Sequence, residues 1–272
     1  MASNLITLLM IVKNEENQIS RCLQSCKDVI DNWIIIDTGS NDRTIEKIYS
    51  ELSHIPGKIV SRPWINFGQN RSELLQEFEN TYTLESSSNF ALLMDADQTL
   101  LVNNPNFKEE IPSGDQFLIE VISDGTYEYR MPYFIRMNQK YSYVGSTHEY
   151  LNAHNPGSTR TLYHDLTIKH HGDGGSKSDK LIRDLILLTD EIKRNPSNSR
   201  AHFYLGQTYS ELGAHELALL CYQSAFEKSN WVEEKYISKL RIAKICLNLN
   251  RESDVEINLL NAINVSKNRI EA

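Results

Sequence analysis

Apolar runs alternate with amphipathic segments along the first hundred residues of the chain. Short apolar runs bounded by polar residues are typical of buried strands, whereas apolar positions three and four residues apart are typical of helices. The pattern predicts strands over Leu5–Val12, Trp33–Ile36, Lys58–Val60 and Phe90–Met94, with helices over Asn14–Lys27, Thr44–Leu52 and Phe67–Phe78 between them. Strands that alternate with helices pair in parallel, so we expect an α/β fold with a mostly parallel sheet and helices on both faces.

The pattern changes after residue 110, where apolar and polar residues alternate one by one. Asp124-Gly125 lies between two such stretches and favours a hairpin turn. Extended structure is predicted for Gln116–Ser123, Tyr127–Met137, Tyr141–Leu151 and Ser158–Lys169. A glycine-rich loop, His170–Gly175, follows, so this part of the chain is predicted to be a β-rich insertion.

From Ser178 onward the pattern is helical throughout, with Leu181, Leu185, Leu188 and Ile192 on one face. The segment Ser199–Asn230 has the spacing of a tetratricopeptide repeat, carried by Leu205, Gly206, Tyr209, Gly213, Ala218, Tyr222 and Ala225. A degenerate second copy is carried by Ile242, Ala243, Cys246, Val255, Leu259 and Ala262. Two copies are fewer than a free-standing repeat array needs, so we expect these helices to dock on the first domain or on another subunit. A homodimer through the helical region is therefore one hypothesis. The expected domains are residues 1–175 and 176–272.

Composition narrows the classes of function. With 40% hydrophobic and 24% charged residues the chain resembles an ordinary soluble globular protein, and its net charge of −8 argues against a nucleic-acid partner. The apolar run Leu5–Val12 is too short to span a bilayer and lacks a basic leader and a cleavage site, so no membrane span or signal peptide is expected. Reduced, mostly buried thiols and a cytoplasmic location are expected, because no metal-ligand spacing links Cys22, Cys26, Cys221 and Cys246.

Two carboxylates one residue apart, Asp95 and Asp97, follow the predicted strand Phe90–Met94. Open α/β sheets bind ligands at the carboxyl ends of their strands. Carboxylate oxygens are hard donors that suit Mg²⁺ or Mn²⁺, and these cations bind the phosphates of nucleotides. The Asp-x-Asp pair is therefore a candidate metal site; the alternative is a pair of solvated aspartates that open a loop.

Two further residues are candidates for binding a nucleotide. Asp37 lies at the end of the second predicted strand, where a carboxylate can hydrogen-bond a nucleobase or ribose. The other interpretation is that this loop caps the next helix through Ser40 or Asn41, and the two roles are compatible. Arg71 lies on a predicted helix, from which its guanidinium could clamp a diphosphate; the alternative is a surface arginine.

Glu149 lies near the end of the β-rich insertion, where it could take a proton from an attacking hydroxyl while His148 orients it. The alternative is that His148 and Glu149 form an exposed strand pair. His170 is a possible third metal ligand, with His171 and His164 as alternatives.

Six segments in a fixed order resemble family 2 glycosyltransferases of the GT-A fold, and in particular the subgroup with tetratricopeptide-like helices at the C-terminus. They are MIVKNEE (10–16), IIIDTGSNDRT (34–44), PWINFGQNR (63–71), LLMDADQTL (92–100), THEYL (147–151) and IKHHG (168–172). The resemblance implies a Rossmann-like GT-A domain, residues 1–175, and a hexosyltransferase that transfers sugar with inversion from a nucleotide-diphosphate sugar. That donor is most often a UDP-sugar, with Mn²⁺ or Mg²⁺ as the cation.

The resemblance also implies roles for single residues. At the donor site, Glu15 and Asp37 would bind the nucleoside and Arg71 would contact the donor phosphates. Asp95 would bind the ribose or a metal-bound water, and Asp97 and His170 would bind the metal. Glu149 would be the general base. Two departures from the family pattern are Gln98, where an acidic residue is common, and the loop from His171 to Gly175, where relatives carry aromatic residues.

The acceptor is left open between a glycan, a peptide and a lipid-linked sugar. A competing hypothesis is a catalytically degenerate, glycosyltransferase-like scaffold that binds proteins through its helical repeats. A third hypothesis, a nucleotidyltransferase, needs a glycine-rich basic loop near the N-terminus, and Lys13–Glu16 is not such a loop.

Overall fold

The computed structural model describes residues 4–82, 88–123, 126–174 and 179–269. The chain divides into two compact units, which we call the sheet unit and the helical unit. The sheet unit comprises Met1–Val144 and Glu149–Ser178, and the helical unit comprises Gly145–His148 and Asp179–Ala272. A four-residue segment before Glu149 thus belongs to the helical unit, although it lies far from the helices in sequence.

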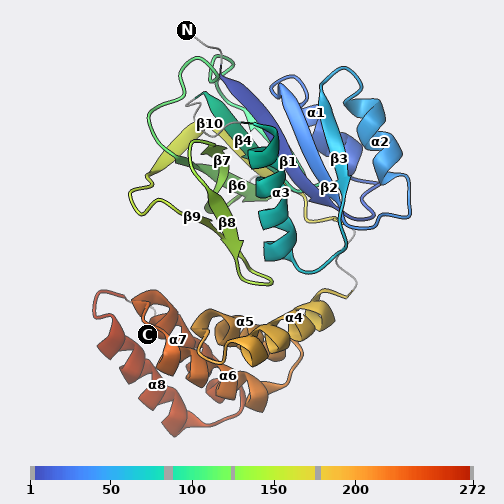
Figure 1. The fold of residues 1–272 in the computed structure, drawn as a ribbon. Coiled ribbons are helices and arrows are strands. Elements are labelled where there is room, and N and C mark those ends of the chain that lie inside the picture. The colour runs from blue at the N-terminus through green and yellow to red at the C-terminus, as the bar shows by residue number, and fades with distance from the viewer. Residues whose placement is uncertain (1–3, 83–87, 124–125, 175–178, 270–272) are drawn as a thin grey trace. The chain divides into compact units, whose positions relative to one another are not determined.

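The described part of the sheet unit contains an eight-stranded sheet in the order β3-β2-β1-β4-β7-β6-β10-β5 (Figure 1). The strands are β1 (Leu5–Val12), β2 (Asn32–Asp37), β3 (Gly57–Ser61), β4 (Asn89–Leu93), β5 (Gln98–Val102), β6 (Gln116–Ser123), β7 (Thr126–Arg136) and β10 (Arg160–His170). Strands β3, β2, β1 and β4 run parallel, β7 is antiparallel to both of its neighbours, and β10 is parallel to β6. The predicted α/β fold with a mostly parallel sheet is confirmed.

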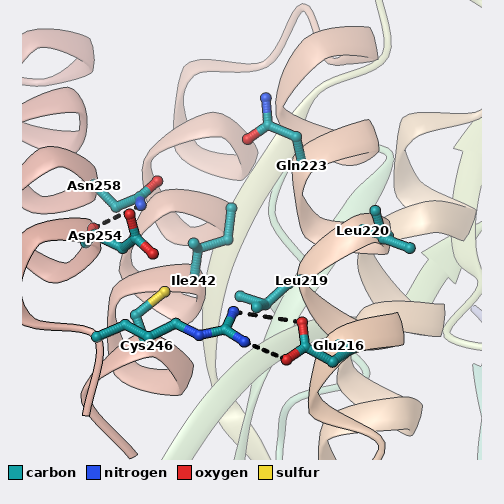
Figure 2. Close-up of a pocket in the computed structure, with 9 residues that line it drawn as sticks. Glu216, Leu219, Leu220, Gln223, Ile242, Cys246, Asp254 and Asn258 are labelled. Atoms are coloured by element: carbon teal, nitrogen blue, oxygen red, sulfur yellow. Dashed lines mark hydrogen bonds and ion pairs between the residues drawn. The ribbon is translucent and has the colours of Figure 1, made fainter. Parts of the chain in front are cut away.

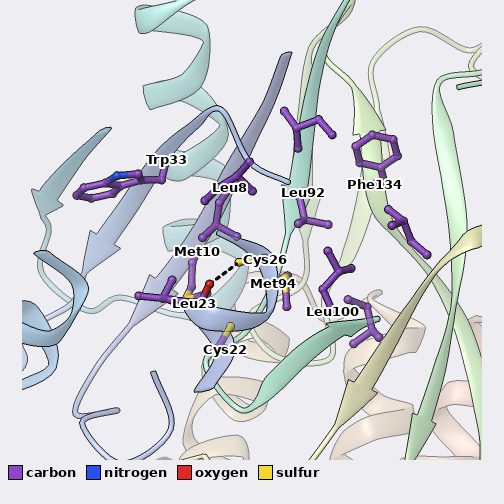
Figure 3. Packing of buried hydrophobic residues seen from close by; sticks show 14 of the residues in the cluster. Leu8, Met10, Cys22, Leu23, Cys26, Trp33, Leu92, Met94, Leu100 and Phe134 are labelled. Carbon is purple, nitrogen blue, oxygen red and sulfur yellow. Dashed lines mark hydrogen bonds between the residues drawn. The ribbon is translucent and has the colours of Figure 1, made fainter. Parts of the chain in front are cut away.

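Both faces of the parallel strands are covered by helices. Side chains alternate along β1, so Leu8 and Met10 face one layer while Leu9 faces the other. Helices α1 (Ile19–Cys26) and α2 (Thr44–Glu51) pack on the first face, where Cys22, Leu23 and Cys26 join the core (Figure 3). Helix α3 (Phe67–Thr81) covers the second face with Leu74, Leu75 and Phe78.

The β-rich segment extends the same sheet rather than forming a separate layer. Strands β6 and β7 form a hairpin in which Ser123 pairs with Thr126; the predicted turn Asp124-Gly125 lies outside the described residues, as does Gly175. Strands β8 (Tyr141–Val144) and β9 (Tyr150–Ala153) form a small antiparallel pair of their own. The chain between them supplies the segment that belongs to the helical unit.

Three elements differ from the sequence-based expectation. The stretch Tyr141–Leu151 was predicted to be extended throughout, but it is divided between β8 and β9, and residues 145–149 lie outside both strands. Helix α1 begins at Ile19 rather than Asn14, because Asn14 has a φ of 56° and the amides of Asn14 and Glu15 are bound by side chains of the neighbouring loop. Strand β5 was not predicted as a strand. It follows Asp97 directly and pairs with β10, and its sequence, two polar residues followed by three apolar ones, has no strand periodicity that would reveal it.

The helical unit contains α4 (Lys180–Arg194), α5 (Ser199–Glu211), α6 (His215–Lys228), α7 (Val232–Asn248) and α8 (Glu252–Val265). Gly206 on α5 lies so close to α6 that a Cβ there would stand 3.1 Å from the ring of Tyr222. The small and aromatic residues of this segment therefore bring the two helices into close contact, as their spacing predicted.

A pocket of about 360 Å³ lies within the helical unit, lined by residues of α6, α7 and α8 and by Arg251, which forms an ion pair with Glu216 (Figure 2). Its apolar lining includes Leu219, Leu220 and Ile242. None of the residues predicted for binding or catalysis lines this pocket.

The four cysteines are free thiols. Burial raises the pKa of Cys26 to about 12 and that of Cys221 to about 11, so both stay protonated at neutral pH. Among the described residues, no helix combines the length and the apolar character that crossing a bilayer requires.

Candidate active site

The parallel strands bring several predicted residues to one edge of the sheet. Val12 at the end of β1 pairs with Asp37 at the end of β2, and β4 runs parallel to β1 on its other side. The segments that carry Glu15, Asp37 and Asp95 therefore leave the sheet at the same edge. This is the edge at which open α/β sheets bind their ligands.

Arg71 lies at the centre of a cluster of charges. It projects from α3, its side chain is only 14% exposed, and its Nη2 lies 2.6 Å from Oδ1 of Asp95. Its Nε lies 2.8 Å from Oε1 of Glu149, and its guanidinium stands 5.7 Å from the ring centre of Tyr143. Burial alone would lower the pKa of Arg71, but the charges of Asp95 and Glu149 outweigh it and raise the pKa above its ordinary value. The structure thus joins three of the predicted site residues, and the alternative of a surface arginine is wrong.

Asp97 and His170 form a second pair. Gln98 on β5 pairs with His170 on β10, and this register sets Nε2 of His170 3.3 Å from Oδ2 of Asp97. Burial would raise the pKa of Asp97, but His170 and the backbone amide of Gly174 hold it below its ordinary value. Of the three histidines considered, His170 is the one whose ring reaches Asp97; the ring of His171 contacts Thr99 instead.

In the described part of the chain, no three His, Cys, Asp or Glu side chains come together as a metal-binding group. Asp97 and His170 are adjacent, whereas the carboxylate of Asp95 is engaged by Arg71. The three residues predicted to bind metal are therefore divided between two ion pairs: Asp97 pairs with His170, and Asp95 pairs with Arg71.

Asp37 is almost fully buried, and its carboxylate accepts hydrogen bonds from the amides of Gly39 and Ser40, both at 3.1 Å. Gly39 has a φ of 105°, a conformation that favours glycine. The proposal that Ser40 or Asn41 caps the next helix is wrong, because Asp42 accepts the hydrogen bond from the amide of Thr44 at the start of α2. Ser40 and Asn41 instead bind Asn14.

Glu149 does not form an exposed strand pair with His148. Its side chain is 13% exposed, and it lies just before β9. The ring of His148 stacks on Tyr204 of the helical unit, with the ring centres 4.0 Å apart, rather than supporting Glu149. The expected orienting role of His148 is therefore replaced by a contact with α5.

Two features of the site were missed by sequence reasoning. Gln98 is 2% exposed, accepts a hydrogen bond from the amide of Asp95 and donates one to the hydroxyl of Tyr133, each at 3.0 Å. A neutral amide at this position therefore ties the Asp-x-Asp turn to β7. Arg21 on α1 forms a two-pronged ion pair with Asp173, which attaches the loop after His170 to α1. Neither partnership has a local signal, since the partners are 35 and 152 residues apart.

Comparison with known proteins indicates glycosyltransferases as the class that the chain is similar to, although no protein-family model matches it. The SPβ prophage-derived glycosyltransferase SunS of Bacillus subtilis (strain 168) is 24% identical over 226 residues, which are 79% of this chain and 51% of SunS. An uncharacterized glycosyltransferase of Rickettsia bellii is 33% identical over 67 residues, 25% of this chain and 21% of that protein. The chain thus spans about half the length of SunS.

The fold is also found in a solved structure. S. aureus TarS 1–349, in complex with UDP-GlcNAc, aligns over 98% of this chain and 93% of that one, with a TM-score of 0.52 and 12% identity. A TPR repeat-containing protein of Synechococcus elongatus is 27% identical over 130 residues, 47% of this chain and 29% of that protein. The chain therefore has an α/β fold with a helical C-terminal region, an arrangement that TarS 1–349 also adopts.

Proposed function

We propose that this chain is a family 2-like, inverting glycosyltransferase that moves a sugar from a UDP-sugar to an acceptor hydroxyl with a divalent cation. The observation that carries the proposal is the pairing of Arg71 with Asp95 and Glu149 beside the pair Asp97–His170. Sequence similarity to glycosyltransferases and the shared fold of TarS support the same class.

In this proposal the donor binds along the carboxyl edge of β1, β2 and β4. Glu15 and Asp37 line the nucleoside pocket, and Asp95 binds the ribose or a metal-bound water. Arg71 is permanently charged and presents a planar fork that matches a diphosphate. Because Arg71 is held by two carboxylates, an arriving diphosphate competes with Asp95 and Glu149 for the guanidinium.

The donor set suits Mn²⁺ or Mg²⁺. Asp97 would offer a carboxylate oxygen and His170 an imidazole nitrogen, two atoms that lie 3.3 Å apart, and Asp95 or the donor diphosphate would supply further oxygen ligands. A bound cation supplies positive charge against the negative charge that develops on the departing diphosphate.

Glu149 is the proposed general base. The acceptor oxygen forms a bond to the anomeric carbon while the bond from that carbon to the diphosphate oxygen breaks. The hydroxyl proton passes to the Glu149 carboxylate, and the diphosphate leaves with the electron pair. Attack from the side opposite the leaving group inverts the anomeric configuration.

The test is a thermal-shift and donor-hydrolysis assay of the full chain with UDP-, GDP- and TDP-sugars, each with Mn²⁺, with Mg²⁺ or with a chelator. We expect stabilisation by a UDP-sugar and Mn²⁺ of about 2.7 kcal/mol at a 100-fold excess over Kd. Slow hydrolysis of the same donor should accompany it, and the chelator should abolish both effects.

Matched variants assign the effect to the site. Asp97→Asn should lose the Mn²⁺-dependent stabilisation, whereas Asp28→Asn, the same change at an exposed turn position, should keep it. If no nucleotide or metal stabilises the wild-type chain, the scaffold hypothesis takes its place.

A further inference from the structure

Gln98 closes the turn that carries Asp95 and Asp97. It is the first residue of β5 and is 2% exposed. Its side-chain oxygen accepts a hydrogen bond from the amide of Asp95 at 3.0 Å, and its own amide donates to the backbone oxygen of Asp95 at 3.1 Å. Both backbone polar groups of Asp95 are therefore bonded to one residue, Gln98.

A further contact fixes the orientation of the Gln98 side chain. A backbone amide can only donate, so the oxygen of the Gln98 side chain faces Asp95 and its nitrogen is free to donate elsewhere. Nε2 of Gln98 donates to the hydroxyl of Tyr133 at 3.0 Å. Tyr133 precedes Phe134 on β7, and Phe134 pairs with Leu92 of β4. The acceptor thus comes from the strand that is paired with β4, the strand leading into the turn.

The buried amide joins the turn to β7 without adding charge. A buried polar group is costly unless it is hydrogen-bonded, and both polar atoms of the Gln98 side chain have partners. An ionised carboxylate accepts hydrogen bonds but donates none, so at this position it could not donate to Tyr133. It would also bring a third negative charge to a turn that already carries Asp95 and Asp97. The two bonds need a neutral side chain that both accepts and donates.

Gln98 also adjoins the other residues proposed to bind the cation. Asp97 precedes it in the chain, and in the antiparallel register of β5 and β10 Gln98 lies opposite His170. A displacement of Gln98 would therefore move the turn relative to His170 as well as loosen Asp95.

We propose that Gln98, supported by Tyr133, is a positioning residue for this turn: its amide sets the backbone from which Asp95 and Asp97 project. This inference rests on the proposed function, in which these carboxylates bind the cation and the donor. Groups that hydrogen-bond to metal ligands orient them, and their removal typically weakens metal binding about 10- to 100-fold. Gln98 acts through the turn and not by contact with the cation.

Amide hydrogen exchange of the full chain, without nucleotide or metal, tests the contact itself. The amide of Asp95 is bonded to the Gln98 side chain, whereas the preceding amide, that of Met94, donates to the backbone oxygen of Leu9 at 3.2 Å. In Gln98→Met the amide of Asp95 should exchange about tenfold or more faster, while that of Met94 exchanges as in the wild type. Unchanged exchange at Asp95, or an equal acceleration at Met94, would overturn the proposal.

The second measurement is the affinity for Mn²⁺ in the presence of UDP, from the electron paramagnetic resonance signal of free Mn²⁺. Gln98→Met should raise the Kd for Mn²⁺ about 10- to 100-fold. Tyr133→Phe removes one oxygen atom and should raise it about 3- to 10-fold, the effect of one lost hydrogen bond. Gln24→Met and Tyr49→Phe make the same changes at exposed side chains and should bind Mn²⁺ like the wild type.

The double variant shows whether Tyr133 acts through Gln98. In the Gln98→Met background, Tyr133→Phe should cause no further loss of Mn²⁺ affinity, because the amide that Tyr133 orients is gone. An equal loss in both backgrounds would contradict the supporting role of Tyr133. Wild-type Mn²⁺ affinity in Gln98→Met would contradict the positioning role of Gln98.

These results separate the inference from the proposed function. If the wild-type chain binds neither UDP nor Mn²⁺, the proposed function fails and the positioning role fails with it. If the wild type binds both, and Gln98→Met speeds exchange at Asp95 without changing the Mn²⁺ affinity, the positioning role alone is refuted.

Discussion

At the scale of single residues, Arg71 is the residue of the candidate site that contacts two carboxylates at once. Its guanidinium is buried and meets two carboxylates that come from different parts of the chain, Asp95 after β4 and Glu149 before β9. A buried cation of this kind is tolerated only where its partners are well placed. Its Nη2 donates a hydrogen bond to Asp95, whereas its Nε forms an ion pair with Glu149 that lacks hydrogen-bond geometry.

Replacing Arg71 by lysine separates shape from charge. Arg71→Lys keeps the positive charge but has one nitrogen in place of the fork, so it cannot meet both carboxylates and a diphosphate in the same way. We expect affinity for UDP with Mn²⁺ to fall about tenfold, or about 1.4 kcal/mol, in titration calorimetry. Arg194→Lys is the control, because Arg194 forms an exposed ion pair with Asp190 on α4, and this variant should bind UDP like the wild type. Equal affinity in the two variants would remove Arg71 from the donor site.

Single residues also mark where sequence reasoning stops. Asp95, Asp97 and Asp37 could be singled out because each follows an apolar strand, a feature visible in a few consecutive residues. The partners could not be foreseen in the same way. The link from Gln98 to Tyr133 and the bond from Arg21 to Asp173 depend on which strands become neighbours, and no short stretch of sequence specifies that.

At the scale of elements, the loops after β1 and β2 brace each other. The amides of Asn14 and Glu15 donate to Ser40 and Thr44, and the amide of Glu16 donates to Asp42. Asp42 also accepts from the amide and hydroxyl of Thr44 at the start of α2. One carboxylate thus holds both the helix start and the loop that carries Glu15.

Asp42 should therefore give a pH-dependent contribution to stability. Burial would raise the pKa of Asp42, but its hydrogen bonds from Thr44 and Glu16 hold it below the ordinary value of 3.8. A lowered pKa in the folded state stabilises the protein above pH 3.8, and this stabilisation is lost as the pH falls through the folded-state pKa. Asp42→Ala should cost about 1 kcal/mol of unfolding free energy at pH 7 and progressively less as the pH falls below 3.8.

Urea unfolding at a series of pH values checks this, with Asp28→Ala at an exposed position as the control. If the unfolding free energy lost in Asp42→Ala stays constant down to the lowest pH at which the protein is folded, the ionised carboxylate is not the stabilising form of Asp42.

The secondary-structure elements were predicted with different accuracy. The strands β1, β2 and β4 are apolar on both faces, and this continuous signal fixed them within a residue or two. The start of α1 was missed because the left-handed Asn14 and the bonds to the next loop override a helical pattern. The antiparallel attachment of β7 to β4 was not foreseen, because the hydrophobic pattern of a strand does not name its neighbour.

At the scale of the whole molecule, each unit has cores of its own. The two clusters on either side of the sheet consist of residues of the sheet unit, whereas α4 to α8 enclose separate clusters around Leu188 and around Tyr222. Damage to a core of the helical unit should therefore leave nucleotide binding at the proposed site unchanged. This separation can be tested in the full chain.

Leu188→Ala should destabilise the helical unit without affecting nucleotide binding. Leu188 is 1% exposed, and truncating a buried leucine costs about 2–5 kcal/mol. Leu220→Ala, at a side chain that is 66% exposed, should change stability by no more than about 0.5 kcal/mol. Circular-dichroism melting measures the first effect, and UDP affinity below the melting range should match the wild type in both variants. A loss of UDP affinity in Leu188→Ala would show that the units are energetically coupled.

The order of the strands has a consequence for how the protein is made. Strand β5 follows β4 almost directly in sequence, yet in the described sheet it lies at the far edge and is hydrogen-bonded to β10 alone. During synthesis β5 leaves the ribosome and must wait for β10, and Asp97 waits for His170, 73 residues later. Contacts between distant segments form slowly, so the pair Asp97–His170 is among the last parts of the sheet unit to assemble. Nascent chains that stop before β10 expose β5 as an unpaired edge, the kind of surface that chaperones must cover.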